Sequence, residues 1–307
     1  MQVKANGINI EVEDTGAEGS QSTRPVVVLI MGLGMQLVAW PMQLVQGLVD
    51  AGYRVVRHDN RDVGLSQHLD EMGTPNVVWE SLKLKLGFLP RAPYSVRDMA
   101  KDTLGVMDAL GVNKAHIVGA SMGGMVAQRV AIEAPQRTLS LTSIMSTSGA
   151  RRLPEASPKV IRALLGRPSG TGEEALVAHY IKLFKVIGSP GFPTPDDVMR
   201  ERILLMIRRS TYRTGTLRQL VAIAADTGKR AEELARITSP TLVLHGKADP
   251  LVPYPCGEDT ARRIAGAKMV GIAGMGHDLP AGVIDQLLPN MLAHFNAATP
   301  HTPHTPT

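Results

Sequence analysis

The sequence predicts a doubly wound α/β fold with a mostly parallel sheet and an all-helical insertion. Continuously apolar, β-branched runs such as residues 25–31 are typical of strands covered on both faces, as in parallel sheets. Helical patterns alternate with such runs up to about residue 150, and the alternation resumes after about residue 240. Between these two parts, residues 151–237 show helical patterns only.

The expected elements follow this rhythm along the chain. The first sixteen residues alternate apolar and polar as strands do, with Asn6-Gly7 as a hairpin turn. Further strands are expected at residues 25–31, 53–58, 115–119, 139–145, 241–245 and 268–272, and helices at about 36–51, 95–111, 122–133, 173–187, 196–225 and 282–296. The strands and helix within residues 25–58 make the first βαβ unit.

The break in this rhythm predicts the domain organisation. Residues 1–150 and 238–298 are expected to form the α/β core, and residues 151–237 a helical cap. The polar, proline-rich residues 299–307 are expected to form a disordered tail.

Charge is concentrated in the insertion. The whole chain has a formal net charge of +5, and residues 151–238 hold 16 basic residues against 9 acidic ones. These charges lie along helix-like stretches without interleaved aromatic residues, which make up 4% of the chain. The pattern therefore predicts a solvated helix surface and excludes the stacking platform of a nucleic-acid binder.

Composition also limits the class of protein. A chain of 307 residues with 44% hydrophobic residues can bury one large core. No run approaches the roughly 18–20 apolar residues of a membrane span. The first residues do not resemble a secretory signal, so we expect a cytoplasmic location. Cys256 is the single cysteine, which excludes an intramolecular disulfide and a multi-cysteine zinc site; it is expected to fill apolar space.

One motif carries most of the functional information. Ser121 lies in a Gly-x-Ser-x-Gly pattern between Gly119 and Gly123, directly after an apolar strand and before an amphipathic helix. This setting is typical of a nucleophile elbow, where the turn is too tight for β-carbons beside the serine. The start of the following helix would also provide backbone N–H groups for a developing oxyanion. A simple strand-to-helix turn of small residues is the alternative.

A serine nucleophile needs a base and a carboxylate that orients it. His277 lies in a glycine-rich loop after a late strand and is the expected base, because His116 and His245 lie inside predicted strands. The expected acid lies just past the strand at 241–245. It is Asp249, with Asp226 and Asp278 as alternatives.

With these residues assigned, the chain resembles the α/β-hydrolase fold serine esterases. Nucleophile, acid and base follow one another in that family's order. Residues 59–66 resemble the family's Asp-x-Arg-Gly-x-Gly-x-Ser loop. Residues 30–34, 57–62 and 274–277 are most similar to aclacinomycin methylesterases and related bacterial hydrolases. The resemblance covers the core, whereas the insertion is similar only to a generic helical cap.

The resemblance implies hydrolysis of a small to medium apolar carboxylic ester through an acyl-enzyme. Its oxyanion hole is carried over to the backbone N–H groups of Leu33 and Met122. Neither a metal nor an organic cofactor is implied, and the expected partner is a small-molecule ester. The substrate-binding residues and the oligomeric state stay open.

Three positions depart from the family pattern, and other activities remain open. Residues 31–34 replace a His-Gly-x-Pro stretch, Asp62 replaces a glycine, and Ala281 lies where a glutamate is common. The same three catalytic groups could hydrolyse a carbon–carbon bond in a diketone-like substrate or support cofactor-free perhydrolysis. A ligand receptor that has lost turnover is a third alternative, since fold alone does not give function. Dehalogenases and epoxide hydrolases of this fold use aspartate where this chain has Ser121.

Overall fold

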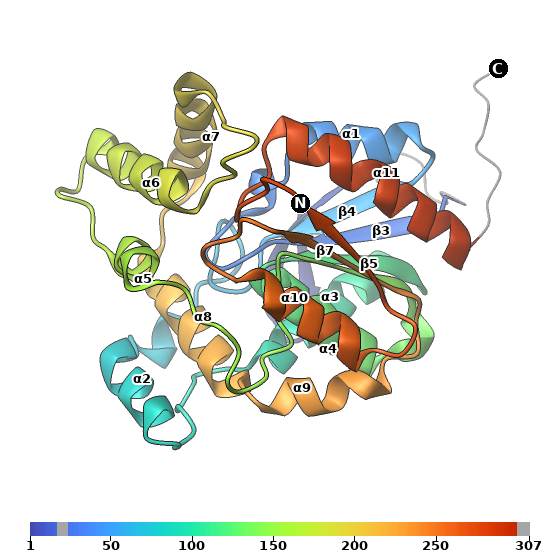
Figure 1. Cartoon of the computed structure of the whole chain (residues 1–307), viewed down its shortest axis with the longest axis horizontal. Helices are drawn as coiled ribbons and strands as arrows, with labels where there is room; N and C mark the ends of the chain where they lie inside the picture. Colours follow the sequence, from blue (N-terminus) through green and yellow to red (C-terminus); the bar gives the residue numbers. More distant parts are fainter. Residues whose placement is uncertain (17–23, 300–307) are drawn as a thin grey trace.

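The computed structural model describes residues 1–16 and 24–299 (Figure 1). Its centre is one sheet with the strand order β1-β2-β4-β3-β5-β6-β7-β8. The strands are β1 (Gln2–Ala5), β2 (Ile8–Asp14), β3 (Val26–Ile30), β4 (Arg54–His58), β5 (Ala115–Ala120), β6 (Thr138–Ile144), β7 (Thr241–Gly246) and β8 (Lys268–Ile272). β1 and β2 pair antiparallel at one edge, and every pair from β4 to β8 is parallel. The predicted doubly wound, mostly parallel sheet is therefore confirmed.

Helices cover both faces of the sheet (Figure 1). One face is covered by α1 (Met42–Asp50) and α11 (Ala281–Ala298), whose apolar side chains form one buried cluster with the strands. On the opposite face, α3 (Val96–Ala109) and α4 (Met122–Glu133) form a second cluster. All five residues of β3 are buried, as the continuously apolar run at 25–31 predicts.

The predicted N-terminal hairpin is confirmed. β1 and β2 are joined by Asn6 and Gly7, whose φ angles are 48° and 85°. Two consecutive positive φ angles are the requirement of a type I′ turn, which Asn-Gly meets at low conformational cost. The predicted tail lies, apart from Thr299, outside the described residues.

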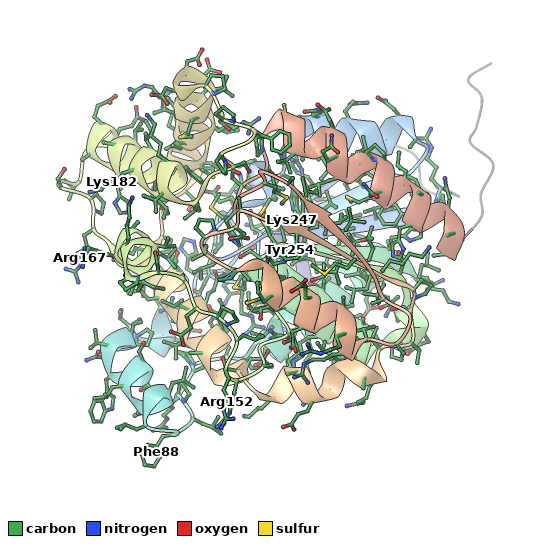
Figure 2. All side chains as sticks on the ribbon, viewed as in Figure 1. Phe88, Arg152, Arg167, Lys182, Lys247 and Tyr254 are labelled. Atoms are coloured by element: carbon green, nitrogen blue, oxygen red, sulfur yellow. The ribbon has the colours of Figure 1, made fainter. Side chains whose placement is uncertain are left out.

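Outside residues 151–237, two helices that the sequence did not predict are α2 (Val77–Lys85) and α10 (Tyr254–Arg263). Pro253 directly precedes α10 and Pro255 is its second residue, and these prolines mask the helical pattern. In α2, the apolar side chains do not form a buried stripe, since Val78 is 81% exposed. Just beyond α2, Phe88 lies at the lower edge of the molecule (Figure 2).

The segment between β6 and β7 contains only helices among its regular elements. They are α5 (Pro158–Leu165), α6 (Glu173–Ile187), α7 (Asp196–Arg209), α8 (Arg213–Asp226) and α9 (Lys229–Glu233), followed by a short 3₁₀ turn. α6 and α7 extend beyond the sheet (Figure 1) and share their own apolar cluster around Ile203. α8 contacts α2 and packs Ala222 into the main core. The domain boundaries at 150 and 238 remain a prediction.

The single helix expected at 196–225 was wrong, because the chain divides into α7 and α8. At the break, Ser210 is extended. The side-chain amide of Gln36 donates to the carbonyl oxygens of Met206 and Ser210, both at 2.8 Å. A core side chain thus satisfies carbonyl groups at the end of α7, so the helix ends without a local glycine or proline signal.

The expectation of a solvated basic surface holds for only part of the insertion. Arg218 and Arg230 are fully buried, at 0% and 1% exposure. Arg218 pairs with Asp62 of the core, and Arg209 pairs with Asp59 at 2.6 Å. Core carboxylates therefore neutralise some of the charge that the composition assigned to the surface. Within residues 1–16 and 24–299, no helix is long and apolar enough to cross a membrane.

Candidate active site

Ser121 lies in the tight turn between β5 and α4. Its backbone angles are φ 56° and ψ −121°, a conformation that is rare for a residue with a β-carbon. Hydrogen bonds to both the N–H and the carbonyl group of Ser121 hold the turn in place. The Ser121 N–H donates to Ile144 O at 2.9 Å, and its carbonyl accepts a hydrogen bond from Ser146 Oγ at 2.7 Å. These contacts hold the serine beyond the carboxyl end of β5.

The glycines on either side of the serine are required by close backbone contacts. A β-carbon added at Gly119 would lie 2.0 Å from Gly123 O. One added at Gly123 would lie 2.0 Å from Ile30 O, in the neighbouring strand. Both positions therefore lack room for any larger residue, as the Gly-x-Ser-x-Gly pattern predicts.

His277 and Asp249 form a hydrogen-bonded chain with Ser121. His277 Nε2 lies 2.9 Å from Ser121 Oγ, and Nδ1 lies 2.7 Å from Asp249 Oδ2. The carboxylate is an acceptor only, so Nδ1 carries the proton and Nε2 has a free lone pair facing the hydroxyl. Both His277 and Asp249 are buried, at 7% and 6% exposure.

The Asp249 carboxylate is fixed by its own loop. Its Oδ1 accepts hydrogen bonds from the backbone N–H groups of Leu251 and Val252, both at 2.9 Å. This leaves Oδ2 for the imidazole. The loop begins where β7 ends, so the acid lies at the same edge of the sheet as the serine.

The alternative carboxylates lie in other networks. Asp226 pairs with Arg129 and Arg230 in the α8–α9 region. Asp278 accepts a hydrogen bond from Ser189 Oγ, and burial raises the pKa of its carboxyl. Of the three aspartates considered from the sequence, Asp249 is therefore the one that is hydrogen-bonded to His277.

The insertion holds the loop that carries His277. The His277 N–H donates to Ile187 O at 2.7 Å, and the Gly276 N–H donates to Ser189 Oγ at 2.8 Å. A third bond joins the Gly191 N–H to Gly274 O at 2.9 Å. The segment after α6 is therefore part of the scaffold of the base, which no local sequence pattern indicated.

A tight turn brings a second backbone segment against Ser121. Met35 N–H donates to Gly32 O at 3.1 Å, and Gly34 has a φ of 65°. A glycine with positive φ at this place is the requirement of a type II turn. A β-carbon added at Gly32 would lie 3.1 Å from Ser121 Cβ. The turn therefore packs directly beside the serine.

This turn and the start of α4 supply two unpaired amide donors. In the part of the chain that the structure describes, neither the Leu33 N–H nor the Met122 N–H has a hydrogen-bond acceptor. Met122 is the first residue of α4, where the helix cannot provide one. Free, fixed N–H groups beside a nucleophile are what an oxyanion hole requires.

The departure at Asp62 has a structural explanation. Asp62 has a φ of 66°, which favours the glycine of the family pattern but is tolerated by aspartate. Its carboxylate binds the Arg218 guanidinium through two contacts of 2.8 Å and accepts the Leu69 N–H at 2.8 Å. Asp62 is less suited than glycine to this backbone conformation, but its carboxylate forms a buried ion pair with Arg218 of α8.

Cys256 has the environment expected of an apolar filler. It is buried on α10, and burial raises the pKa of its thiol to about 11. The thiol is therefore protonated near neutral pH, and a nucleophilic role is disfavoured. Across residues 1–16 and 24–299, no group of three or more His, Cys, Asp or Glu side chains is placed to hold a metal ion.

Comparison with known families places this geometry in context. A family model described as the alpha/beta hydrolase fold matches residues 25–179, and one described as TAP-like protein matches residues 223–293. The chain belongs to the α/β-hydrolase fold family. The family resemblance drawn from the residues around Ser121, Asp249 and His277 is thereby confirmed.

Individual relatives of this α/β hydrolase cover most of its length. A rhodomycin D methylesterase of Streptomyces sp. strain C5 is 32% identical, over 89% of this chain and 91% of the relative. A 2-hydroxy-6-oxononadienedioate/2-hydroxy-6-oxononatrienedioate hydrolase of Cupriavidus pinatubonensis is 27% identical, over 87% and 84%. A solved structure of a mutant meta-cleavage product hydrolase from Pseudomonas fluorescens IP01 shares the fold, with a TM-score of 0.71 at 20% identity. The match covers 97% of this chain and 98% of that one.

Proposed function

We propose that this α/β hydrolase is a carboxylic ester hydrolase in which Ser121 is the nucleophile, His277 the base and Asp249 the acid. The observation that carries the proposal is the continuous hydrogen-bonded chain from Asp249 Oδ2 through the imidazole to Ser121 Oγ. It gives a weak nucleophile a base within reach and fixes the tautomer of that base. The two unpaired amides beside the serine provide the oxyanion site.

The proposed mechanism is acyl transfer in two halves. Ser121 Oγ attacks the ester carbonyl while His277 Nε2 takes the hydroxyl proton. The N–H groups of Leu33 and Met122 donate to the oxyanion, and the ionised Asp249 stabilises the imidazolium without taking its proton. His277 then protonates the departing alcohol, and water hydrolyses the acyl-enzyme by the same route. His277 is the group that accepts or donates the proton in each of these steps.

The proposed substrate is a small to medium apolar ester. One relative is a methylesterase, which favours an ester with a small alcohol as its leaving group. Buried methionines such as Met122 and Met125 lie at the start of α4, where flexible thioether side chains suit an apolar acyl group. We propose that residues 151–237 act as a cap over this site and that the enzyme works in the cytoplasm.

Hydrolysis of a carbon–carbon bond is the second candidate, because one relative is named for a 2-hydroxy-6-oxo-dienedioate substrate.

A substrate panel separates ester hydrolysis from carbon–carbon bond hydrolysis. We expect kcat/KM for p-nitrophenyl acetate, p-nitrophenyl butyrate and an aromatic methyl ester to exceed that for a 2-hydroxy-6-oxo-dienoate by at least about 100-fold. A reversed preference would overturn ester hydrolysis in favour of carbon–carbon hydrolysis. A parallel assay for peracid formation with acetate and hydrogen peroxide tests perhydrolysis.

A further inference from the structure

The turn at residues 32–35 presents its amides in three different ways. Met35 N–H closes the turn on Gly32 O at 3.1 Å. Gly34 N–H donates at 2.9 Å to Oε1 of Gln219, a residue of α8 that lies 185 positions further along the chain. Leu33 N–H has no acceptor within the described residues. Of these three donors, only the Leu33 N–H is therefore left free for a ligand.

Gln219 is held in a single orientation. It is fully buried, and while its Oε1 accepts from Gly34, its Nε2 donates to Arg61 O at 2.9 Å. The two ends of the amide cannot be exchanged, because one faces an N–H group and the other a carbonyl oxygen. The side chain thus joins the turn beside Ser121 to a second core loop.

The turn needs such a contact because glycine imposes little conformation of its own. Gly34 can adopt positive or negative φ with similar ease, so the peptide between Leu33 and Gly34 is free to rotate between two turn types. Only one of these orientations directs the Gly34 N–H toward Gln219. Thr216, one helical turn earlier, restricts the same place, since a β-carbon added at Gly34 would lie 2.7 Å from its Oγ1.

We propose that Gln219 is a positioning residue for catalysis: by holding the Gly34 N–H, it keeps the turn at 32–35 in one conformation on α8, and this fixes the place of the neighbouring Leu33 N–H that we assign to the oxyanion. The inference rests on the proposed ester hydrolysis. It makes helix α8 part of the catalytic scaffold, through an amide that touches neither substrate nor Ser121.

The same helix offers a matched control. Tyr212, the residue before α8, donates its hydroxyl proton to Asp70 and accepts from Arg218 Nη2 at 2.6 Å. These contacts also join α8 to its surroundings, but they do not reach the turn at 32–35. Tyr212→Phe therefore weakens the docking of α8 without removing the hydrogen bond to Gly34.

The test compares Gln219→Met, Gln219→Glu and Tyr212→Phe with the wild type. For Gln219→Met, we expect kcat for p-nitrophenyl butyrate to fall about 10- to 100-fold with little change in KM. The reason is that a misplaced Leu33 N–H weakens its hydrogen bond to the oxyanion, which forms mainly in the transition state. The affinity for an alkylboronic acid, which forms a tetrahedral adduct on serine, is expected to fall by a similar factor. Gln219→Glu keeps an acceptor for Gly34 and, once its carboxyl is protonated, also a donor for Arg61 O, so its kcat relative to the wild type should rise as the pH is lowered. Tyr212→Phe should keep wild-type kcat.

Each outcome bears on the inference. Wild-type kcat and boronate affinity in a folded Gln219→Met would overturn it, as would equal losses in Gln219→Met and Tyr212→Phe. Should Gln219→Met not fold, a folded Gln219→Glu whose kcat relative to the wild type stays low as the pH is lowered would also contradict it. Boronate binding is measured by calorimetry and needs no turnover, so the role of Gln219 is tested even if no ester is hydrolysed. Failure of the proposed function alone would appear as a wild type that binds boronate but hydrolyses no ester.

Discussion

Replacing Ser121 with alanine is expected to lower kcat/KM for p-nitrophenyl butyrate by about 10⁵-fold or more while the fold persists. The Ser121 oxygen would form the acyl-enzyme, and within residues 1–16 and 24–299 it is the side-chain atom that His277 Nε2 contacts, at 2.9 Å. The residual rate is expected to come from binding and from the amides of the oxyanion site. Initial rates are followed by nitrophenolate release, and circular dichroism and thermal melting check the fold.

A buried serine in the neighbouring strand β6 provides the control for this variant. Ser143 lies in β6 and its Oγ accepts a hydrogen bond from Gln128 at 3.2 Å, away from the imidazole. Ser143→Ala is expected to keep turnover of wild-type magnitude. Wild-type activity in a folded Ser121→Ala protein would rule out this serine as the nucleophile.

The largest expected effect on stability comes from the buried pair between Asp62 and Arg218. Both side chains are 0% exposed. Arg218→Leu leaves the carboxylate buried without a cation, and breaking such a pair costs about 3–5 kcal/mol in the free energy of unfolding. Chemical denaturation followed by circular dichroism measures this loss. The surface pair of Arg200 and Glu174 is the control, and Arg200→Ala, which removes it, should leave the free energy of unfolding close to the wild-type value.

A double variant separates the charge from the packing. Asp62→Gly combined with Arg218→Leu removes both charges and restores the glycine that suits a φ of 66°. It should recover most of the stability that Arg218→Leu loses. A double variant no more stable than Arg218→Leu alone, or an Arg218→Leu loss no larger than that of Arg200→Ala, would contradict the assigned role of the pair.

The same pair has a predicted pH dependence. Burial raises the pKa of Asp62, but the hydrogen bonds from Arg218 and the Leu69 N–H outweigh it, so the folded-state pKa lies below its ordinary value. A lowered carboxyl pKa adds stability above the unfolded-state value of about 4, and the contribution is lost as the pH falls through the lowered pKa. The stability difference between the wild type and Arg218→Leu should therefore shrink in acid.

Local patterns were sufficient to predict the core and the serine turn. Residues 25–31 are continuously apolar because β3 is covered on both faces. The burial of this strand can therefore be predicted from its apolar composition alone. The Gly119 and Gly123 positions follow from steric contacts within one turn. The order of Ser121, Asp249 and His277 was informative because each follows a strand that ends at the same edge of the sheet.

Contacts between distant segments could not be predicted in this way. Gln219 reaches Gly34 across 185 positions, and Arg218 reaches Asp62 across 156. Each lies in a helical stretch whose composition is that of an ordinary solvated helix, so nothing local marks it as buried. Ser189, which supports the His277 loop, lies in a glycine- and proline-rich connection that reads only as a break between helices.

Labelling with a fluorophosphonate, followed by intact-mass measurement and peptide mapping, tests the central claim most directly. The chain contains fifteen serines, so the position of an adduct is a demanding outcome. We predict one adduct per chain on the peptide that carries Ser121, loss of esterase activity in proportion to labelling, and no adduct on Ser121→Ala or on the denatured wild type. A folded wild type that hydrolyses esters while Ser121 stays unlabelled, or that carries its adduct elsewhere, would contradict the claim.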